Sequence, residues 1–241
     1  DAVGNNNTAA TQFNWTYDAT PPTGSGTSAD PYLVANLGNL SWIAQNSGDW
    51  DKYYRQTANI DATETQYWDD ADDDSDGNLY NDTYDGTSTG NNEGFSPIGG
   101  GTTKFTGEYD GDGYYIAGLT IDRSTNAIGL FGWTSGTTIK DLGVTNVNIT
   151  GNNYIGGLVG YNRYEGPSTM SHCYSTGSVS GNNDVGGLFG LVYTDTISNC
   201  YSTSSVSGNS YVGGLVGYNR DYSTAVNCYS TGSVTGSGDF V

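Results

Sequence analysis

The sequence has few basic residues. Seven Lys and Arg stand against 26 Asp and Glu, which gives a formal net charge of −19. A surface with this charge repels the phosphates of nucleic acids and the headgroups of anionic membranes. We therefore expect no nucleic-acid partner and no binding to anionic lipid surfaces.

Long apolar runs are missing too. No stretch approaches the roughly 20 apolar residues that a membrane-spanning helix needs, and no basic, apolar leader stands at the start. A composition rich in Gly, Thr, Ser, Asn and Tyr and poor in Lys is typical of mature exported proteins, and Asp1 is compatible with a processed terminus. We expect an extracellular or cell-surface location without membrane insertion.

Residues for nucleophilic or zinc chemistry are scarce. The single histidine, His172, excludes a Ser-His-Asp triad and an HExxH metal site. It precedes Cys173 in an expected strand, where adjacent side chains point to opposite faces, so the two are poorly placed to act together. Three cysteines cannot form a closed disulfide set, and their spacing matches no zinc motif. These shortages predict a protein that is not an enzyme.

Glycine, in contrast, is abundant, with 37 of 241 residues, and much of it lies in a repeat. The anchor of the repeat is Ile155-Gly-Gly-Leu-Val-Gly160, which returns with small changes at Val185–Gly190 and Val212–Gly217. A looser copy begins at Ile128, so successive anchors start 27, 30 and 27 positions apart. Each full anchor is followed by a second block, Cys-Tyr-Ser-Thr-x-Ser-Val, which begins at Cys173, Cys200 and Cys228.

The repeat predicts an all-β fold, a parallel β-solenoid of about five coils over residues 105–241. Each unit holds short β-prone runs broken by Gly and Asn and shows no helical period, and such units bury their apolar faces by stacking. Alternation within the second block places Cys and Val inside and Tyr outside. Equivalent residues of stacked coils lie above one another. We therefore expect an internal column of Cys173, Cys200 and Cys228 and an external column of Tyr174, Tyr201 and Tyr229.

Two regions precede the solenoid. Residues 1–22 form an extended N-terminal segment, and residues 23–104 form a capping region that contains an Asp-rich insertion at 69–86. Leu37, Leu40 and Ile43 have helical spacing, so a short helix at about 37–46 is predicted to cover the open end of the solenoid. Caps of this kind are expected in repeat arrays.

The run Gly-Gly-Leu-Val-Gly-Tyr-Asn at 156–162 and 213–219, followed by Asn-Cys-Tyr-Ser-Thr-Gly-Ser-Val at 227–234, resembles the GLUG-motif repeat of bacterial surface proteins and adhesins. The upstream pieces 24–32, 97–99 and 105–113 resemble the leader that such proteins often carry. The resemblance spans roughly residues 23–241. It implies a β-solenoid on an exported protein that serves in attachment or surface architecture, and it supplies no catalytic residues.

Three carboxylates are candidates for a catalytic group. Glu108, Asp110 and Asp112 stand close together, and paired carboxylates hydrolyse glycosidic bonds. Their Asp-Gly context is equally typical of ordinary turns, which is the favoured interpretation. Arg163 and Arg220 follow two anchors at equivalent positions and are expected to form a surface pair.

The insertion at 69–86 contains the start of a calcium loop. Asp72, Asp74 and Asp76 precede a glycine in the pattern Asp-x-Asp-x-Asp-Gly, whose carboxylates converge on one hard cation. The Asn78 carbonyl and Asp82 complete the expected ligands, although the bidentate Glu at the twelfth loop position is absent. Calcium is the predicted cofactor, and a solvated acidic loop is the alternative.

Asn-x-Ser/Thr sequons also mark candidate glycosylation sites. They are Asn6, Asn14, Asn39, Asn81 and Asn148.

Assembly into a filament is the predicted role of both ends of the chain. Residues 11–18 alternate apolar and polar side chains, with Phe13, Trp15 and Tyr17 on one face, and a Gly- and Pro-containing linker follows them. We expect this strand to add to a neighbouring subunit, next to Phe240 and Val241, so that copies join head to tail. A strand that folds back onto its own solenoid is the alternative.

The sequence thus favours a non-catalytic structural or adhesive surface protein, a subunit of a fibre. The competing interpretation is a carbohydrate-binding or carbohydrate-active β-solenoid, whose tyrosine-lined outer face would contact surface glycans. Ice binding through Thr columns is disfavoured, because the outer face mixes Tyr, Thr and Ser.

Overall fold

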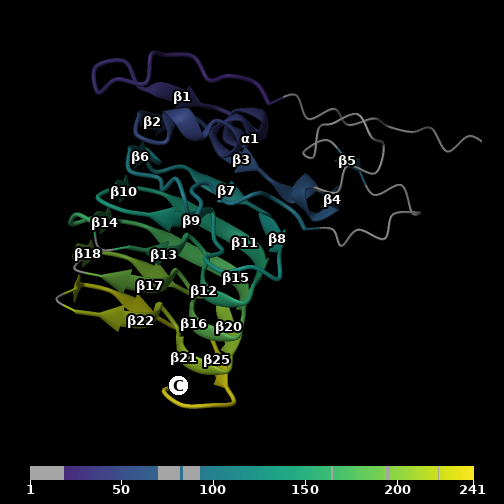
Figure 1. Cartoon of the computed structure of the whole chain (residues 1–241), viewed down its shortest axis with the longest axis vertical. Helices are drawn as coiled ribbons and strands as arrows, with labels where there is room; N and C mark the ends of the chain where they lie inside the picture. Colours follow the sequence, from purple (N-terminus) through teal and green to yellow (C-terminus); the bar gives the residue numbers. More distant parts are fainter. Residues whose placement is uncertain (1–18, 70–81, 84–92, 164, 194–195, 222) are drawn as a thin grey trace, which may run out of the picture.

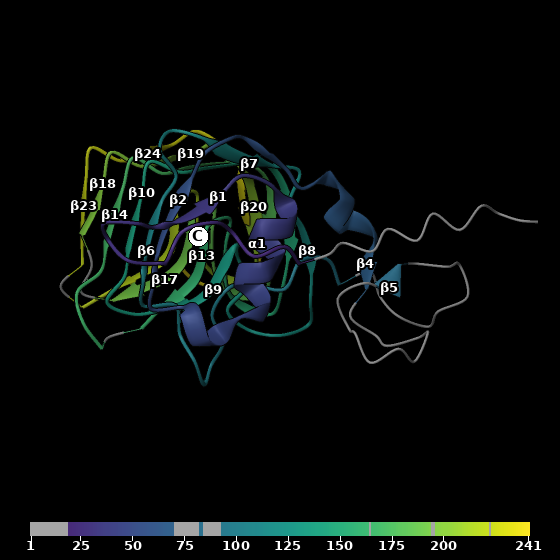
Figure 2. The same ribbon diagram turned by 90° about the horizontal axis from the view of Figure 1, so that it is seen from above.

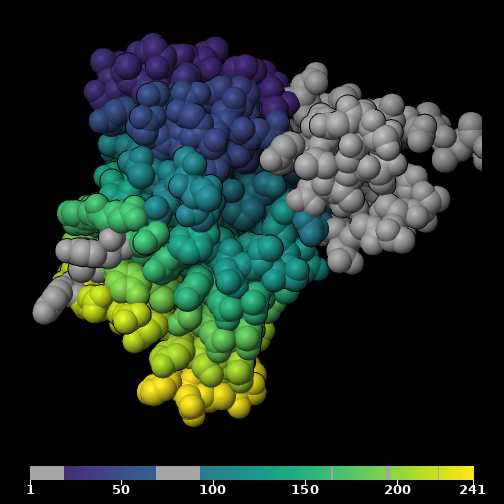
Figure 3. All heavy atoms as spheres, viewed as in Figure 1, coloured from purple at the N-terminus to yellow at the C-terminus, as the bar shows by residue number. Residues whose placement is uncertain are grey.

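The computed structural model describes residues 19–69, 82–83, 93–163, 165–193, 196–221 and 223–241. These residues form a parallel β-solenoid whose coils stack along the long axis, which confirms the predicted all-β fold (Figure 1). Four parallel sheets run along the stack, because equivalent strands of successive coils pair with one another. In the space-filling view the coils form successive bands of colour (Figure 3).

The first sheet has seven strands in the order β1-β2-β6-β10-β14-β18-β23. They are β1 (Tyr32–Val34), β2 (Tyr53–Gln56), β6 (Glu108–Asp110), β10 (Thr138–Lys140), β14 (Thr169–Ser171), β18 (Thr196–Ser198) and β23 (Thr224–Val226). The second sheet has nine strands. They are β3 (Ile60–Asp61), β7 (Tyr115–Ala117), β8 (Thr120–Asp122), β11 (Gly143–Thr150), β15 (Tyr174–Ser180), β19 (Tyr201–Ser202), β20 (Ser205–Gly208), β24 (Tyr229–Ser230) and β25 (Val234–Gly236).

The third and fourth sheets carry the anchors. The third sheet consists of β12 (Asn153–Gly156), β16 (Asn183–Gly186) and β21 (Ser210–Gly213). The fourth consists of β9 (Phe131–Thr134), β13 (Val159–Asn162), β17 (Phe189–Tyr193) and β22 (Val216–Arg220). A separate antiparallel pair joins β4 (Trp68–Asp69) to β5 (Asp82–Thr83).

One coil passes through the four sheets in sequence. The first coil is β6–β9, the second β10–β13, the third β14–β17 and the fourth β18–β22, and β23–β25 begin another. The predicted five coils therefore correspond to four complete coils and part of a fifth. The anchors align as the repeat predicts, since Ile128 pairs with Ile155, Ile155 with Val185, and Val185 with Val212.

The parallel stack also extends upstream of residue 105. Strands β1 and β2 belong to the first sheet, and Ile98 and Phe105 make parallel bridges to the fourth. Helix α1 (Leu37–Gln45) lies across the end of the stack, where a helix was predicted (Figure 2). The short 3₁₀ helices η1 (Ser47–Asp49) and η2 (Thr63–Tyr67) complete this region.

Helix α1 is held on the stack by its apolar face. Leu37, Leu40 and Ile43 are at most 2% exposed, so the stripe that predicted the helix is also its contact with the core. The side chain of Asn36 caps the helix by accepting a hydrogen bond from the Asn39 main-chain N–H at 2.9 Å. Trp50 fixes the other end, because its indole Nε1 donates to the Ile43 carbonyl at 2.7 Å.

Glycine is required in the anchor because neighbouring coils touch there through their backbones. A Cβ on Gly156 would meet the Val159 carbonyl oxygen of its own coil and would lie 2.7 Å from the Leu188 oxygen of the next. Any side chain would therefore push the coils apart.

At the corner between the first and second sheets, the structure differs from the expectation that His172 lies in a strand. His172 is not within a strand; it occupies a left-handed corner between β14 and β15, with φ of 53°. Asp141, Asn199 and Asn227 occupy the same corner in other coils, with φ between 52° and 54°. Asp and Asn adopt this conformation more readily than most residues, which explains their recurrence.

Candidate functional site

The cysteine column forms, with two of its three members inside the core, whereas Cys228 at the end of the stack is only partly buried and packs against the core. Cys173 and Cys200 are fully buried, and the main-chain N–H of Cys173 donates to Cys200 Sγ at 3.4 Å. The Cys173 thiol donates to the Ser171 carbonyl, and burial raises its pKa well above the ordinary value. His172 points elsewhere, since its Nδ1 lies 3.4 Å from Asp141 Oδ1 at the surface. The geometry provides no Cys-His pair.

Two of the three carboxylates considered for hydrolysis, Glu108 and Asp110, are engaged with a lysine. Lys140 Nζ lies 2.7 Å from Glu108 Oε1 and 3.3 Å from Asp110 Oδ2. The hydrogen bond to Glu108 is the main cause that raises the Lys140 pKa, so the lysine stays charged and offsets one of the two negative charges. Asp112 lies in the expected turn, where its main-chain N–H donates to Asp110. This arrangement supports the turn interpretation.

Arg163 and Arg220 follow equivalent anchors but have different partners. Arg163 Nε lies 3.5 Å from Glu165. Arg220 lies over the Tyr193 ring, 5.2 Å from its centroid, and donates to the Tyr193 hydroxyl at 2.6 Å. The two arginines therefore do not form one site.

Most residues of the calcium prediction lie outside the described residues, namely Asp72, Asp74, Asp76 and Asn78. Asp82 is in β5, where it pairs with Asp69 of β4. Within the described parts of the chain, no three His, Cys, Asp or Glu side chains are grouped in a way that could hold a metal ion. Calcium binding stays a prediction.

Two of the five sequons lie within the described residues. Asn148 is exposed on β11 and is accessible to a glycosylating enzyme. Asn39 is 5% exposed, and its Nδ2 donates to the Thr20 carbonyl at 2.8 Å, so the folded chain hides this sequon. The others, Asn6, Asn14 and Asn81, lie outside the described residues.

The assembly residues are only partly described. Phe13, Trp15 and Tyr17 lie outside the described residues. Phe240 and Val241 are 70% and 61% exposed. The Phe240 ring stacks on Tyr211 with centroids 4.9 Å apart.

The tyrosine column forms on the second sheet. The rings of Tyr174 and Tyr201 have centroids 5.0 Å apart, those of Tyr201 and Tyr229 5.2 Å apart, and both pairs are within 4° of parallel. Each ring therefore covers the face of the next. The column presents ring edges, and a sugar stacks on ring faces, so this column is a poor sugar platform.

A second aromatic group, which the sequence reasoning missed, lies along the fourth sheet and at the left-handed corner residue within the strands of the third sheet. Its signal is a recurrence of Tyr directly before and directly after the anchor, at Tyr154 and Tyr161 and again at Tyr211 and Tyr218. Within each pair the rings stack at 4.9 and 4.7 Å.

Other coils vary this aromatic pattern. In the third coil, Asp184 occupies the position before the anchor and Leu191 the position after it. Asp184 is 9% exposed, its Oδ1 has no hydrogen-bond partner among the described residues, and burial raises its pKa to about 6. The first coil has Ala127 and Trp133.

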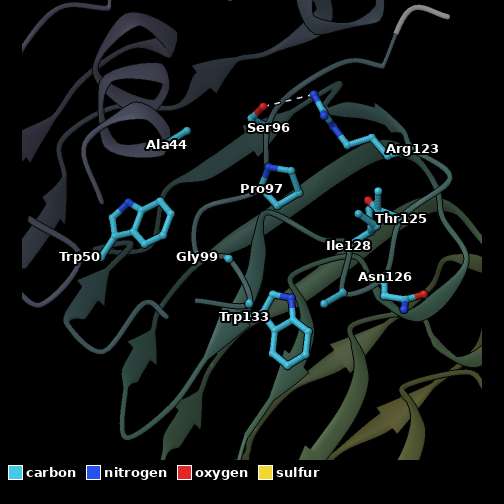
Figure 4. A pocket seen from close by; sticks show the side chains of 13 residues that line it. Ala44, Trp50, Ser96, Pro97, Gly99, Arg123, Thr125, Asn126, Ile128 and Trp133 are labelled. Carbon is cyan, nitrogen blue, oxygen red and sulfur yellow. Dashed lines mark hydrogen bonds between the residues drawn. The ribbon is translucent and has the colours of Figure 1, made fainter. Parts of the chain in front are cut away.

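A hollow adjoins this first-coil variation. A cavity of about 330 Å³ lies between the end of α1, the loop 96–101 and the corner 123–128 (Figure 4). Trp50 borders it on one side and Trp133 on another, and Arg123 and Asn126 stand at its rim. Arg123 is ion-paired with Glu93 at 3.0 Å and hydrogen-bonded to the Ser96 hydroxyl at 3.2 Å.

The chain is thus a parallel β-solenoid that is built from glycine-anchored repeats and carries an aromatic surface. Residues 151–180 and 208–235 match the family model of the GLUG motif, so the chain is a GLUG-repeat protein. Halomucin from Haloquadratum walsbyi (strain DSM 16790 / HBSQ001) is 34% identical over 179 residues, which cover 66% of this chain. The chain spans only 2% of the length of halomucin.

A solved structure shares the fold. It is the crystal structure of a "putative immunoglobulin A1 protease" from Bacteroides ovatus, with a TM-score of 0.66 and 20% identity over 90% of this chain and 61% of that chain. At this identity the likeness concerns the fold alone. Among the described residues no helix has the length and apolar character needed to cross a bilayer. The GLUG repeats and the halomucin similarity indicate a surface-associated β-helix protein.

Proposed function

We propose that this chain is a non-catalytic structural or adhesive module at the cell surface. The observation that carries the proposal is the similarity to halomucin over 66% of the chain, together with the two GLUG matches. The architecture is suited to such a role, because the coils stack along one axis into an elongated module with continuous lateral surfaces (Figure 1). The ion-paired carboxylates and buried thiols described above also favour a role without catalysis.

Surface exposure is testable on intact cells of the source organism. We expect antibodies against the solenoid to label unpermeabilised cells, and mild protease treatment to remove the label without lysis. A cytosolic protein serves as the lysis control. Labelling that requires permeabilisation would contradict a surface location.

The finer proposal is assembly into a fibre. Residues 11–18 have the alternation of a β-strand, and main-chain pairing of the kind that already joins the coils would let such a strand add to a neighbouring subunit. Deleting residues 1–20 is expected to leave a folded monomer that does not polymerise. Electron microscopy and light scattering of both forms provide the measurement, and fibres of equal length from the truncated chain would refute this route.

We also propose that the Asp-rich insertion at 69–86 binds calcium. Titration calorimetry of chelator-treated protein should detect calcium binding, because clustered carboxylates repel one another without a cation. Binding should disappear when three residues are changed to Asn, namely Asp72, Asp74 and Asp76. A chain that binds no calcium at millimolar concentration would rule the site out.

A further inference from the structure

The hollow beside Trp133 exists because the first coil lacks a ring that other coils have. The corner residues Ala127, Tyr154 and Tyr211 share a left-handed backbone, with φ of 61°, 62° and 54°. In the second and fourth coils the corner tyrosine stacks on the tyrosine that follows the anchor. In the first coil the corner residue is Ala127, so no corner ring stacks on the Trp133 indole, and Ala127 lines the cavity instead.

Glycine keeps the opposite wall open. The loop 99–101 is Gly-Gly-Gly and borders the cavity. A Cβ on Gly101 would lie 3.9 Å from Trp133 Cε2, in ordinary contact with the indole edge, so a longer side chain there would enter the space over the ring. The glycines of the loop 99–101 and the small side chain of Ala127 thus leave the same space over the Trp133 indole empty.

The polar groups at the rim favour a neutral ligand. Arg123 is already paired with Glu93, so it contributes no unbalanced charge, and the net charge of −19 opposes anions. Asn126 accepts two hydrogen bonds from Asn153 through its Oδ1, at 3.2 and 3.0 Å, which leaves its own amide N–H groups available to a ligand. An indole surface with uncharged donors and acceptors around it suits the apolar face and the hydroxyls of a sugar ring.

The surroundings indicate a chain of sugars rather than a single one. Trp133 packs against Tyr161 with centroids 4.6 Å apart, and Tyr161 against Tyr193 at 6.0 Å. The aromatic group therefore continues from the hollow along the axis of the stack. Tyr154 covers one face of Tyr161 and Arg220 covers one face of Tyr193, so beyond the hollow these rings offer edges and hydroxyl groups to further sugars, and the stacking surface is Trp133. A cavity of about 330 Å³ lies at the lower end of the range for ligand pockets and is large enough for one sugar ring.

We propose that this hollow, with the Trp133 indole as its stacking surface, binds one ring of a neutral saccharide chain that continues along the fourth sheet. The site requires no catalytic group. It goes beyond the surface role and is independent of fibre formation, because its residues belong to one chain.

Two substitutions test the site from opposite directions. Trp133→Ala removes the stacking surface, and Ala127→Tyr restores the corner ring of the second and fourth coils, which would occupy the space over the indole. Tyr174→Ala is the matched control, because it removes an aromatic ring from the second sheet. Circular dichroism checks the fold of each variant, and Trp133→Leu, which also lacks an aromatic face, replaces Trp133→Ala if the latter does not fold.

Binding is measured by titration calorimetry with cellohexaose, xylohexaose and maltohexaose, and with polygalacturonate as the charged comparison. We expect the wild type and Tyr174→Ala to bind at least one neutral oligosaccharide equally well. Ala127→Tyr and Trp133→Ala should bind it about tenfold more weakly or worse. The proposal is overturned if the wild type binds none of the three at millimolar concentration, if it prefers polygalacturonate, or if the folded pocket variants bind like the wild type. Failure here leaves the cell-labelling test of surface location unaffected.

Discussion

Substituting Gly186 by alanine is the most direct test of how the anchors hold the coils together. Gly186 lies in β16, between Gly156 of one neighbouring coil and Gly213 of the other. A Cβ on Gly186 would meet the Phe189 carbonyl oxygen and would lie 2.5 Å from the Gly217 nitrogen and 2.9 Å from the Val216 carbonyl carbon. All three atoms are main-chain atoms, so no side chain can move aside and the coils themselves must shift.

The expected cost is at the upper end of what overpacking produces, about 3 kcal/mol. For a chain of this size, this corresponds to a melting temperature lower by about 6 to 12 °C. Because stability in a repeat array is shared between neighbouring coils, the damage should be greatest where β16 meets β21. Hydrogen exchange of the amides between these strands should accelerate more than exchange in the first coil.

Gly48→Ala is the matched control. Gly48 lies in η1, and no atom is found within 4 Å of where its Cβ would be. The same chemical change there should leave the melting temperature unchanged or slightly raise it, since alanine reduces the entropy of the unfolded chain. If the two variants melt at the same temperature, the steric explanation of the anchor glycines is wrong.

Three further predictions concern the aromatic column, a buried carboxylate and the net charge. Tyr201→Ser should lower the free energy of unfolding about twice as much as Tyr229→Ser, because the central ring stacks on two neighbours and each contact contributes about 0.5–1.5 kcal/mol; equal losses in urea titrations would contradict this. Burial raises the pKa of Asp184 to about 6, so its ionisation destabilises the fold as pH rises from the unfolded value through 6. Asp184→Asn should therefore melt above the wild type at pH 7.5 and close to it at pH 4, whereas the same gain at both pH values would refute the argument. Raising NaCl from 0.05 to about 1 M should increase the melting temperature, because salt screens the self-repulsion of a chain with net charge −19, and an unchanged value would show that this repulsion is negligible.

The repeat alone was sufficient to predict which residues stack. Coils that pair in parallel and in register place equivalent positions above one another, so three copies of one block at fixed spacing imply columns. The Cys173 and Tyr174 columns and the alignment of the anchors followed directly. The capping helix was also predictable, because its apolar stripe is local and does not depend on what the helix covers.

Features that depend on differences between coils were decided by the tertiary structure. His172 is at a left-handed corner because the chain must change direction there, and the alternation of a strand does not reveal where it bends. Lys140 forms ion pairs with Glu108 and Asp110 only because neighbouring coils bring β10 beside β6. The hollow at Trp133 is lined by Ala127, Gly101 and Trp50, which belong to three separate segments. The sizes of their side chains create a hollow only because the stack brings these segments together around one space. Position within a coil is encoded locally, whereas the contacts made by an exceptional residue depend on the coil that lies above it and on the coil below it.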